Sequence, residues 1–294
     1  MFEGDILMDN EDLLQRIAEQ YKRMSKGQKL IADFILNNYD KAAFMTASKI
    51  GQKVGVSEST VVRFANMLGY EGYPQLQKAL QEVIRNKLTT VQRIEMTSEL
   101  DESTLLKTVS KMDINNIRLT VEEINKEVFN RVVDRIFSAR SIYVLGLRSA
   151  APLAQFMGYY LSFIFEKVRV VTSGVNDILE QLINIQPQDL LIGISFPRYA
   201  RRTVEAMAFA KNKGAETVAI TDSLLSPLTS YADHILLARS DMASFVDSLV
   251  APLSLINALI VAVGIRKKAD ISSEFQELER IWGEYGVYIG KDGS

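Results

Sequence analysis

Between residues 141 and 267, short apolar runs alternate with segments whose apolar residues recur at helical spacing. The apolar runs are SIYVLG (141–146), VRVVTS (168–173), DLLIGIS (189–195), TVAIT (217–221) and HILLA (234–238). Such runs predict strands covered on both faces, and an intervening helix predicts that successive strands pair in parallel. We therefore expect a doubly wound parallel sheet of five strands, with helices near 151–165, 175–185, 201–213 and 246–267.

The composition narrows the class of protein further. The chain of 294 residues contains no Cys and one His, which excludes disulfides, thiolate metal sites and multi-histidine centres. No signal peptide opens the chain. The most apolar stretch, 246–265, contains Asp247, Asn257 and Pro252, so we interpret it as a buried helix and not as a membrane span. We expect a cytoplasmic bacterial protein without a cofactor or a metal.

The net charge of −2 conceals an uneven distribution of charge. Residues 21–93 contain 12 Lys and Arg and 5 Asp and Glu, a net charge of +7, whereas the flanking segments are acidic. A basic segment inside an acidic chain is expected of a nucleic-acid-binding module, because the DNA backbone is a polyanion. Charge alone does not distinguish this module from a solvated basic surface.

The basic segment also contains the pattern of a helix-turn-helix, TASKIGQKVGVSESTVVRFANMLGY (46–70). Gly51 is small enough for two helices to approach closely, and Gly55 suits the left-handed position that ends a helix. Ser57 is a good N-cap for the second helix. The inner face of that helix is Val61, Phe64 and Leu68. Two amphipathic helices precede the pattern, with apolar residues at 13, 17, 21 and 24 and at 30, 31, 34 and 35, the second capped by Ser25.

The second helix of this pattern is the one that would enter the major groove of DNA. Its outward residues are Ser57, Glu58, Ser59, Thr60, Val62 and Arg63. Short hydroxyls can reach base edges or phosphates, and Arg63 can bind a guanine or a phosphate. Alternatively, Ser57 is only a cap and Glu58 only a first-turn acid favoured by the helix dipole. Helical hairpins with similar spacing also occur in unrelated proteins.

Two of the predicted strands end in residues suited to an anion. After the first strand, Gly146 permits close backbone approach and Ser149 offers a hydroxyl. After the third, Ser195 precedes Arg198, Arg201 and Arg202. Helix N-termini, hydroxyls and guanidiniums would converge there on a phosphate or carboxylate. The alternative is that these arginines pair with Asp or Glu across a subunit interface.

Both halves of the chain resemble the RpiR/MurR family of bacterial transcription regulators, which join a helix-turn-helix domain to a sugar isomerase (SIS) domain. The resemblance lies in VGVSESTVVRFANMLGYEGYPQLQ, and in GLRSA, DLLIGISF and AKNKGAETVAITDSLLSPLTSYADHIL. It implies an all-helical N-terminal domain and a C-terminal flavodoxin-like SIS domain. It also implies a homodimer or homotetramer that binds double-stranded operator DNA, with a phosphorylated sugar that changes this binding and a role in carbohydrate or amino-sugar utilisation.

The expected domains are a helix-turn-helix domain at 1–90, a linker and connecting helix at 91–125, and the SIS domain at 126–294. The resemblance places the ligand against Gly146, Arg148, Ser149, Ser195, Arg198 and Arg201. Two loops depart from the family pattern. Arg148 replaces the second Gly of G-x-G-x-S, and the later Ser, Gly and Thr of S-x-S-G-x-T are replaced by Pro197, Arg198 and Ala200. A carboxylated or aminated sugar phosphate, or loss of the site, are the alternatives.

A second class of function is a sugar-phosphate isomerase or lyase with an accessory helical domain. Isomerisation needs a positioned general base, and the candidates are Glu180 and His234. Glu180 fits a solvated helix face, and His234 fits a strand end. The sequence shows no clear pair of acid and base residues, and an isomerase has no use for a helix-turn-helix. We therefore predict that the protein is not an enzyme.

Overall fold

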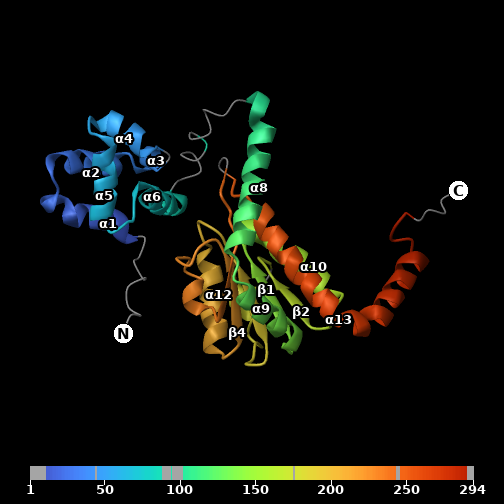
Figure 1. Cartoon of the computed structure of the whole chain (residues 1–294). Helices are drawn as coiled ribbons and strands as arrows, with labels where there is room; N and C mark the ends of the chain where they lie inside the picture. Colours follow the sequence, from blue (N-terminus) through green and yellow to red (C-terminus); the bar gives the residue numbers. More distant parts are fainter. Residues whose placement is uncertain are drawn as a thin grey trace. The chain divides into compact units, whose positions relative to one another are not determined.

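The computed structural model of the chain describes residues 11–43, 45–87, 94, 102–174, 176–242 and 246–289. Contacts divide the chain into two compact units, Met1–Ser98 and Glu99–Ser294, which are coloured blue to cyan and green to red in Figure 1. Most of the polar segment that the sequence predicts as a linker after Arg93 lies outside the described residues. Each unit is described by itself.

The first unit is helical throughout its described residues. Its elements are α1 (Glu11–Gln20), a 3₁₀ turn (Tyr21–Arg23), α2 (Lys26–Asn37), α3 (Tyr39–Ala42), α4 (Ala47–Val54), α5 (Glu58–Met67) and α6 (Tyr73–Lys87). Ser25 caps α2 in a reciprocal capping box with Gln28, as predicted. The apolar spacing of α1 and α2 forms the core through Leu13, Ile17, Ile31 and Ile35, whereas Leu30 is 44% exposed.

The turn between α4 and α5 depends on two glycines. A Cβ atom at Gly51 would lie 2.7 Å from the carbonyl oxygen of Val56, so only glycine leaves room for the chain to turn back over α4. The Val56 N–H donates to the Gly51 carbonyl at 2.8 Å. Gly55 ends α4 with φ at +76°, the left-handed conformation predicted for it. The helix-turn-helix predicted from the sequence is therefore present.

The second unit is an α/β domain. Its elements are a 3₁₀ turn (Glu102–Thr104), α8 (Leu105–Glu123), α9 (Lys126–Ser138), β1 (Ile142–Gly146), a 3₁₀ turn (Arg148–Ala150), α10 (Ala151–Ser162), β2 (Val168–Val171), α11 (Ile178–Gln181), β3 (Leu190–Ile194), α12 (Arg201–Asn212), β4 (Glu216–Thr221), a 3₁₀ turn (Thr229–Tyr231), β5 (His234–Leu237) and α13 (Val250–Glu284). All five predicted strands are present. The helix predicted at 175–185 is shorter, because Asp177 caps its start and it ends at Gln181.

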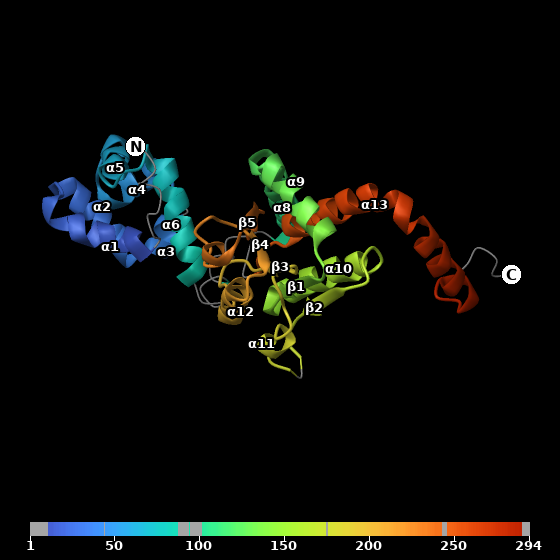
Figure 2. The same ribbon diagram turned by 90° about the horizontal axis from the view of Figure 1, so that it is seen from below.

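All strand pairs in the sheet are parallel, in the order β2-β1-β3-β4-β5. This is the doubly wound, flavodoxin-like order that the prediction names. Helices α9, α10 and α13 pack on one face, against residues such as Ile142 and Val144. Helices α11 and α12 pack on the other face, against Tyr143 and Leu145. Figure 2 shows the sheet between these two helical layers.

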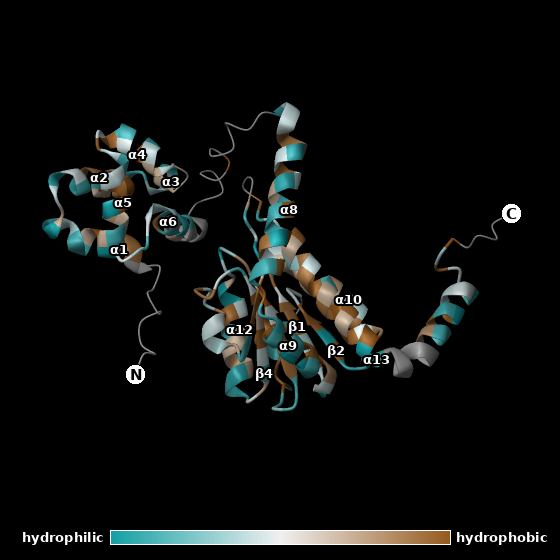
Figure 3. Cartoon of the chain, in the orientation of Figure 1, coloured by the Kyte–Doolittle hydropathy of each residue, from teal (hydrophilic) through white to brown (hydrophobic). Residues whose placement is uncertain are grey.

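Helix α13 has a stretch, Val250–Lys267, that by length and composition alone could cross a membrane. The fold buries 33% of this stretch. One side packs on the core through Ile256, Leu259 and Val263. The expectation of a buried helix is wrong for the other side, where Val261 and Ile265 are 51% and 69% exposed. Apolar colour extends along this part of α13 in Figure 3. A helix of this kind covers the sheet with one face and leaves an apolar face at the surface.

The edge of the sheet where the strands begin is held by an ion pair. Arg140 donates to both carboxylate oxygens of buried Asp189, at 2.8 and 2.7 Å. Burial raises the pKa of the Asp189 carboxyl, but hydrogen bonds from Arg140 and the Gln186 N–H outweigh burial and hold that pKa below its ordinary value. The ion pair joins the segments that lead into β1 and β3.

This pair predicts a pH-dependent stability. Because the folded pKa lies below the unfolded value of about 3.9, the stabilisation is complete above that pH and is lost as pH falls through the folded pKa. Asp189→Asn should lower the free energy of unfolding near neutral pH by about 1.5–3 kcal/mol. Thermal unfolding from neutral pH to about pH 3 should show this difference shrink. The control is Glu122→Gln, which breaks an exposed pair with Arg118; a pH-independent difference would contradict the assignment.

Candidate functional site

The N-terminus of α5 presents a cluster of hydroxyls at the surface. The Ser57 hydroxyl lies 2.9 Å from the Ser59 hydroxyl and 2.9 Å from the Thr60 hydroxyl. Ser57 occupies the N-cap position, but its side chain makes no capping hydrogen bond to the backbone. The interpretation of Ser57 as only a cap is therefore incomplete. The cluster leaves hydroxyls and free helical N–H groups at the end of the helix that would enter DNA.

Charged side chains accompany this cluster on the same helix. Glu58 and Arg63 are both exposed, and the Arg63 Nε donates to the Ser59 carbonyl at 3.3 Å. That bond lays Arg63 back toward the N-terminus of α5, the direction from which a recognition helix approaches bases. Glu58 is in the first turn, where a carboxylate is stabilised by the helix dipole. The residues predicted to face DNA are thus at the surface of α5 or at its N-cap, and their contact with DNA stays a prediction.

The structure adds the start of α2 to this surface, which the sequence did not indicate. A Cβ atom at Gly27 would lie 3.4 Å from Cγ2 of Thr60, so the first turn of α2 lies against the start of α5. Lys26 is exposed in that turn. On α4, Lys49 and Lys53 are exposed as well. We predict that these lysines on the flanking helices contact phosphates when α5 enters the groove.

The second predicted site lies at the edge of the sheet where β1 and β3 end. These strands are hydrogen-bonded neighbours, and Gly146 lies opposite Ile194 in the register. The two loops that follow them therefore start side by side. Helices α10 and α12 leave toward opposite faces of the sheet, and in open parallel sheets ligands bind outside the strand ends at such a position.

In the first loop, Arg148 and Ser149 are exposed and lie in a 3₁₀ turn before α10. Arg148 has φ of 55°, in the left-handed region. A Cβ atom at Gly146 would lie 2.6 Å from the Ala150 carbonyl oxygen and 2.8 Å from Cβ of Ala154. The absence of a side chain at Gly146 is thus explained by contact with the chain's own turn. A ligand contact at its backbone stays a prediction.

In the second loop, Ser195 is 4% exposed, and its hydroxyl makes no hydrogen bond to another described residue. Arg198 follows with φ of 64°, also in the left-handed region. Such a conformation costs an L-residue about 1–2 kcal/mol relative to glycine. Within α12, the hydroxyl of Thr203 is buried without a partner among the described residues. Unpaired hydroxyls and strained backbone are commonly found together at binding sites.

The other two arginines have carboxylate partners inside the chain. The Arg201 Nε donates to Glu205 at 2.8 Å, and Arg202 pairs with Glu205 at 3.1 Å and with Asp177 at 3.5 Å. Hydrogen bonding from Arg201 lowers the pKa of the Glu205 carboxyl, partly opposed by burial. Exposed pairs of this kind bind weakly. Arg201, which is 91% exposed at its side chain, stays available to a ligand.

Of the two candidate bases for an isomerase, only His234 is placed away from the predicted ligand site, while Glu180 is engaged in a capping box beside Asp177, the partner of Arg202. Glu180 is exposed and accepts from the Asp177 N–H in a capping box, as expected for a solvated helix face. His234 begins β5, and its Nε2 lies 2.8 Å from Glu216 at the start of β4. This is the opposite edge of the sheet from the ends of β1 and β3. No catalytic pair forms between these residues at the predicted ligand site.

Comparison with known proteins agrees with both halves of this description. Residues 11–87 match the profile of the helix-turn-helix domain of the rpiR family, and residues 135–262 match the SIS domain. An HTH-type transcriptional regulator of Haemophilus influenzae is 27% identical over 274 residues, which cover 90% of this chain and 94% of the relative.

Solved structures show the same architecture. The sugar isomerase domain of the RpiR transcription factor from Sphaerobacter thermophilus is 32% identical and covers 60% of this chain and 99% of its own, with a TM-score of 0.58. The Vibrio vulnificus NanR protein complexed with ManNAc-6P is 20% identical and covers 95% of this chain and 100% of its own, with a TM-score of 0.57.

A helix-turn-helix unit followed by an SIS unit defines a transcriptional regulator and not an enzyme, as predicted. The chain belongs to the RpiR family of transcriptional regulators.

Arg63 provides a test of the DNA surface. Arg63→Ala should weaken binding to a duplex selected from random sequences by about 1–3 kcal/mol if the guanidinium binds a base. If it binds only phosphate, the loss should be equal on all duplexes and the salt dependence should flatten. Fluorescence anisotropy at several salt concentrations separates the two. Arg131→Ala, at an exposed position of α9, is the control; unchanged affinity of Arg63→Ala would remove Arg63 from the interface.

Proposed function

We propose that this regulator binds operator DNA through the start of α5, and that a phosphorylated sugar bound at the ends of β1 and β3 changes operator binding. The observation that carries the proposal is the convergence of two loops with arginines and serines on one edge of a parallel sheet, next to two helix N-termini. Phosphate groups bind where N–H groups, hydroxyls and guanidiniums converge. We place the protein in the cytoplasm, in control of carbohydrate or amino-sugar utilisation.

Gly146, Arg148, Ser149, Ser195, Arg198 and Arg201 are the residues that we assign to the ligand. The serines would donate hydroxyl hydrogen bonds, and the arginines would replace the hydroxyls that these loops lack. NanR, which shares the fold, is complexed with ManNAc-6P, and this supports the class of ligand without naming the sugar for this chain. A sugar-phosphate isomerase is disfavoured because His234 lies at the other edge of the sheet and the Glu180 carboxylate is engaged in a capping box.

We propose that the signal reaches the DNA-binding unit through α8, the helix that follows the inter-unit boundary. The segment after β5 is bonded to α8 at several points: the Asn116 amide donates to the Asp241 carbonyl at 2.9 Å, and the Arg239 N–H donates to Thr120 at 2.9 Å. Arg239 also pairs with Glu123. Because this segment begins where β5 ends, a change at that edge of the sheet would act on α8 through these bonds.

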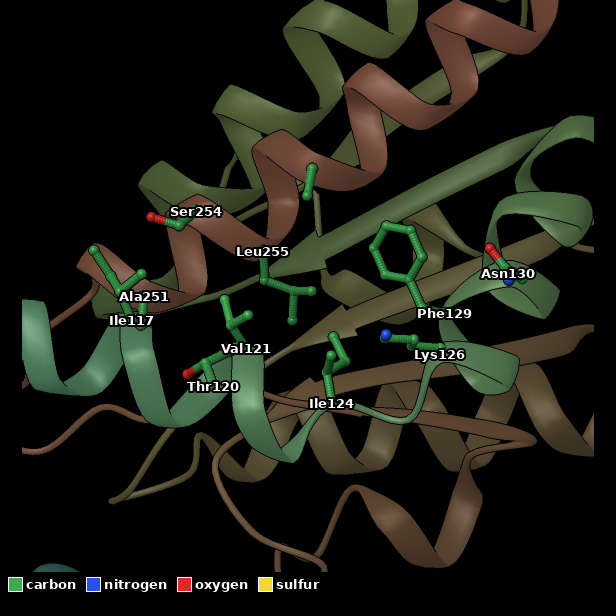
Figure 4. Close-up of a pocket in the computed structure, with 11 residues that line it drawn as sticks. Ile117, Thr120, Val121, Ile124, Lys126, Phe129, Asn130, Ala251, Ser254 and Leu255 are labelled. Atoms are coloured by element: carbon green, nitrogen blue, oxygen red, sulfur yellow. The ribbon is translucent and has the colours of Figure 1, made fainter.

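The proposed regulator is a homodimer or homotetramer that associates through an apolar face of its second unit. A groove of about 300 Å³ lies between α8, α9 and the start of α13. Figure 4 shows apolar side chains from all three helices around it. Its lining comprises Ile117, Thr120, Val121, Ile124, Lys126, Phe129, Asn130, Ala251, Ser254, Leu255 and Ala258. An exposed apolar patch continues along α13 through Val261 and Ile265, and such patches on soluble units mark protein interfaces.

Ligand titration tests the sugar-phosphate site. We expect glucose 6-phosphate, fructose 6-phosphate, N-acetylmannosamine 6-phosphate or 6-phosphogluconate to raise the melting temperature and change operator affinity, since a ligand of the folded state stabilises it. Ser149→Ala and Ser195→Ala should each weaken binding by about 1.5–3 kcal/mol in calorimetry. Ser138→Ala, at the other edge of the sheet, is the control. Wild-type affinity in both serine variants would place the site elsewhere.

Charge on the apolar face tests self-association. Val121 is 67% exposed on α8, so Val121→Glu should fold normally but sediment as a smaller species than the wild type. Operator affinity should then fall by roughly tenfold or more, because one recognition unit loses the linked second contact. The control is Ile183→Glu, at a position 61% exposed after α11 on the other side of the sheet. Identical sedimentation of Val121→Glu and wild type would exclude this face.

A further inference from the structure

A cavity of about 500 Å³ lies at the edge of the sheet where β1 begins, and not at the edge proposed for the sugar phosphate. Three segments line it: the entry to β1 at Arg140, the connection from α10 to β2 at 162–167, and α13 at Lys267 and Leu278. Cavities that bind small molecules have volumes of roughly 300–1,000 Å³. Neither the DNA surface nor the proposed sugar-phosphate site uses any of these residues.

Positive charge exceeds negative charge at this cavity. Among its described lining residues, the charged side chains are those of Arg140, Lys167, Lys267 and Glu166. Arg140 is balanced by buried Asp189, with which it forms an ion pair at 2.7 Å. The two lysines and the glutamate then leave the cavity with a net charge of +1. Lys167 and Glu166 are exposed and form no ion pair with a residue that the structure describes. This charge favours an anionic ligand.

Two of the cations are held in fixed positions. The Lys267 Nζ donates to the Ile164 carbonyl at 2.7 Å and lies 4.8 Å from the centre of the Phe165 ring. An ammonium group has three donors, so two remain for a ligand. Arg140 binds Asp189 through Nε and Nη2, and its Nη1 donates to no residue in the described ranges. Charged donors that are already positioned lose less side-chain entropy when they bind an anion.

The rest of the lining is largely apolar. Phe163 and Phe165 are half-buried directly after α10, and Ile142, Ile164 and Leu278 complete this wall. Aromatic rings favour offset or edge-to-face contacts with other rings. Inorganic phosphate would leave the wall in contact with water, whereas an anion that carries a planar ring would remove apolar surface from water. The lining therefore favours a ligand with both an anionic group and a ring.

We propose that this cavity is a second ligand site, for a small molecule that joins an aromatic ring to one anionic group, a carboxylate or a phosphate. Lys167, Lys267 and the Nη1 of Arg140 bind the anion, and the ring lies against Phe163 and Phe165. Because the lining comes from three segments, the ligand joins α13 to the entry of β1 and stabilises the second unit. The site is separate from the one that we assign to the sugar phosphate.

The experiment uses the full-length protein and matched compounds in calorimetry. 3-Phenylpropionate is compared with the uncharged 3-phenylpropanol, and AMP with adenosine, while propionate and inorganic phosphate lack the ring. We expect one ring-bearing anion to bind roughly tenfold or more tightly than both its uncharged and its ring-free counterpart, the effect of one charged hydrogen bond or one buried ring. Which anion binds distinguishes the carboxylate from the phosphate.

The variants are Lys267→Gln, which keeps a donor for the Ile164 carbonyl, and Lys167→Ala, at an exposed position. We expect each to weaken binding of the ring-bearing anion by roughly tenfold and to leave the affinity for sugar phosphates unchanged. The control is Lys213→Ala, which removes the same charge from an exposed position at the end of α12, on the other face of the sheet.

The inference is overturned if neither ring-bearing anion binds, if the uncharged compounds bind equally well, or if both lysine variants retain wild-type affinity. Binding that is lost in Ser149→Ala and kept in the lysine variants would belong to the sugar-phosphate site. That result would also overturn the inference, while the proposed function would stand.

Discussion

The position of β1 between β2 and β3 is the constraint on which the second unit depends. Chain order reverses there, so α10 and α12 go to opposite faces and the two loops behind β1 and β3 remain uncovered at one edge. Close contacts at two glycines of the sheet allow the flanking turn and helix to pack in this arrangement. Gly146 admits the turn before α10, and a Cβ atom at Gly193 would lie 2.5 Å from the sulfur of Met207 on α12. A larger residue at Gly146 would collide with the backbone turn before α10, and one at Gly193 would displace the Met207 side chain.

The two edges of the sheet differ in their charge pairing and backbone strain. Where the strands begin, charges are paired within the chain: Arg140 with Asp189, Lys211 with Asp233, and Arg135 and His234 with Glu216. Where β1 and β3 end, Arg148 and Arg198 adopt left-handed backbone, and the buried hydroxyl of Thr203 in α12 has no partner among the described residues. Strain and unpaired polar groups are tolerated only when the surrounding structure is firm. The ion pairs where the strands begin stabilise the sheet, and the sheet supports the strained loops where β1 and β3 end, which we assign to the ligand.

Helix α8 joins the segment after β5 to the apolar groove of the second unit. Its polar side bonds the segment after β5, through Asn116, Thr120 and Glu123. Its apolar side lines the groove with α9 and α13 (Figure 4). A helix that belongs at once to a polar network and to an exposed apolar face can change both when a ligand binds. We propose that ligand binding acts on the rest of the protein through these two sets of α8 contacts.

The sequence by itself determined the two-part architecture, because periodicity, caps and turn glycines are local. Gly55, Ser25 and the five apolar runs each predicted the element that they form. The surface of α13 could not be predicted, since apolar residues on both sides of a helix do not reveal which side meets the sheet. The place of Gly27 beside Thr60, the pairing of Arg201 with Glu205, and the left-handed backbone of Arg148 and Arg198 also emerged only in the folded chain. Contacts between distant segments and backbone angles depend on how the whole unit packs, and tertiary structure alone decides them.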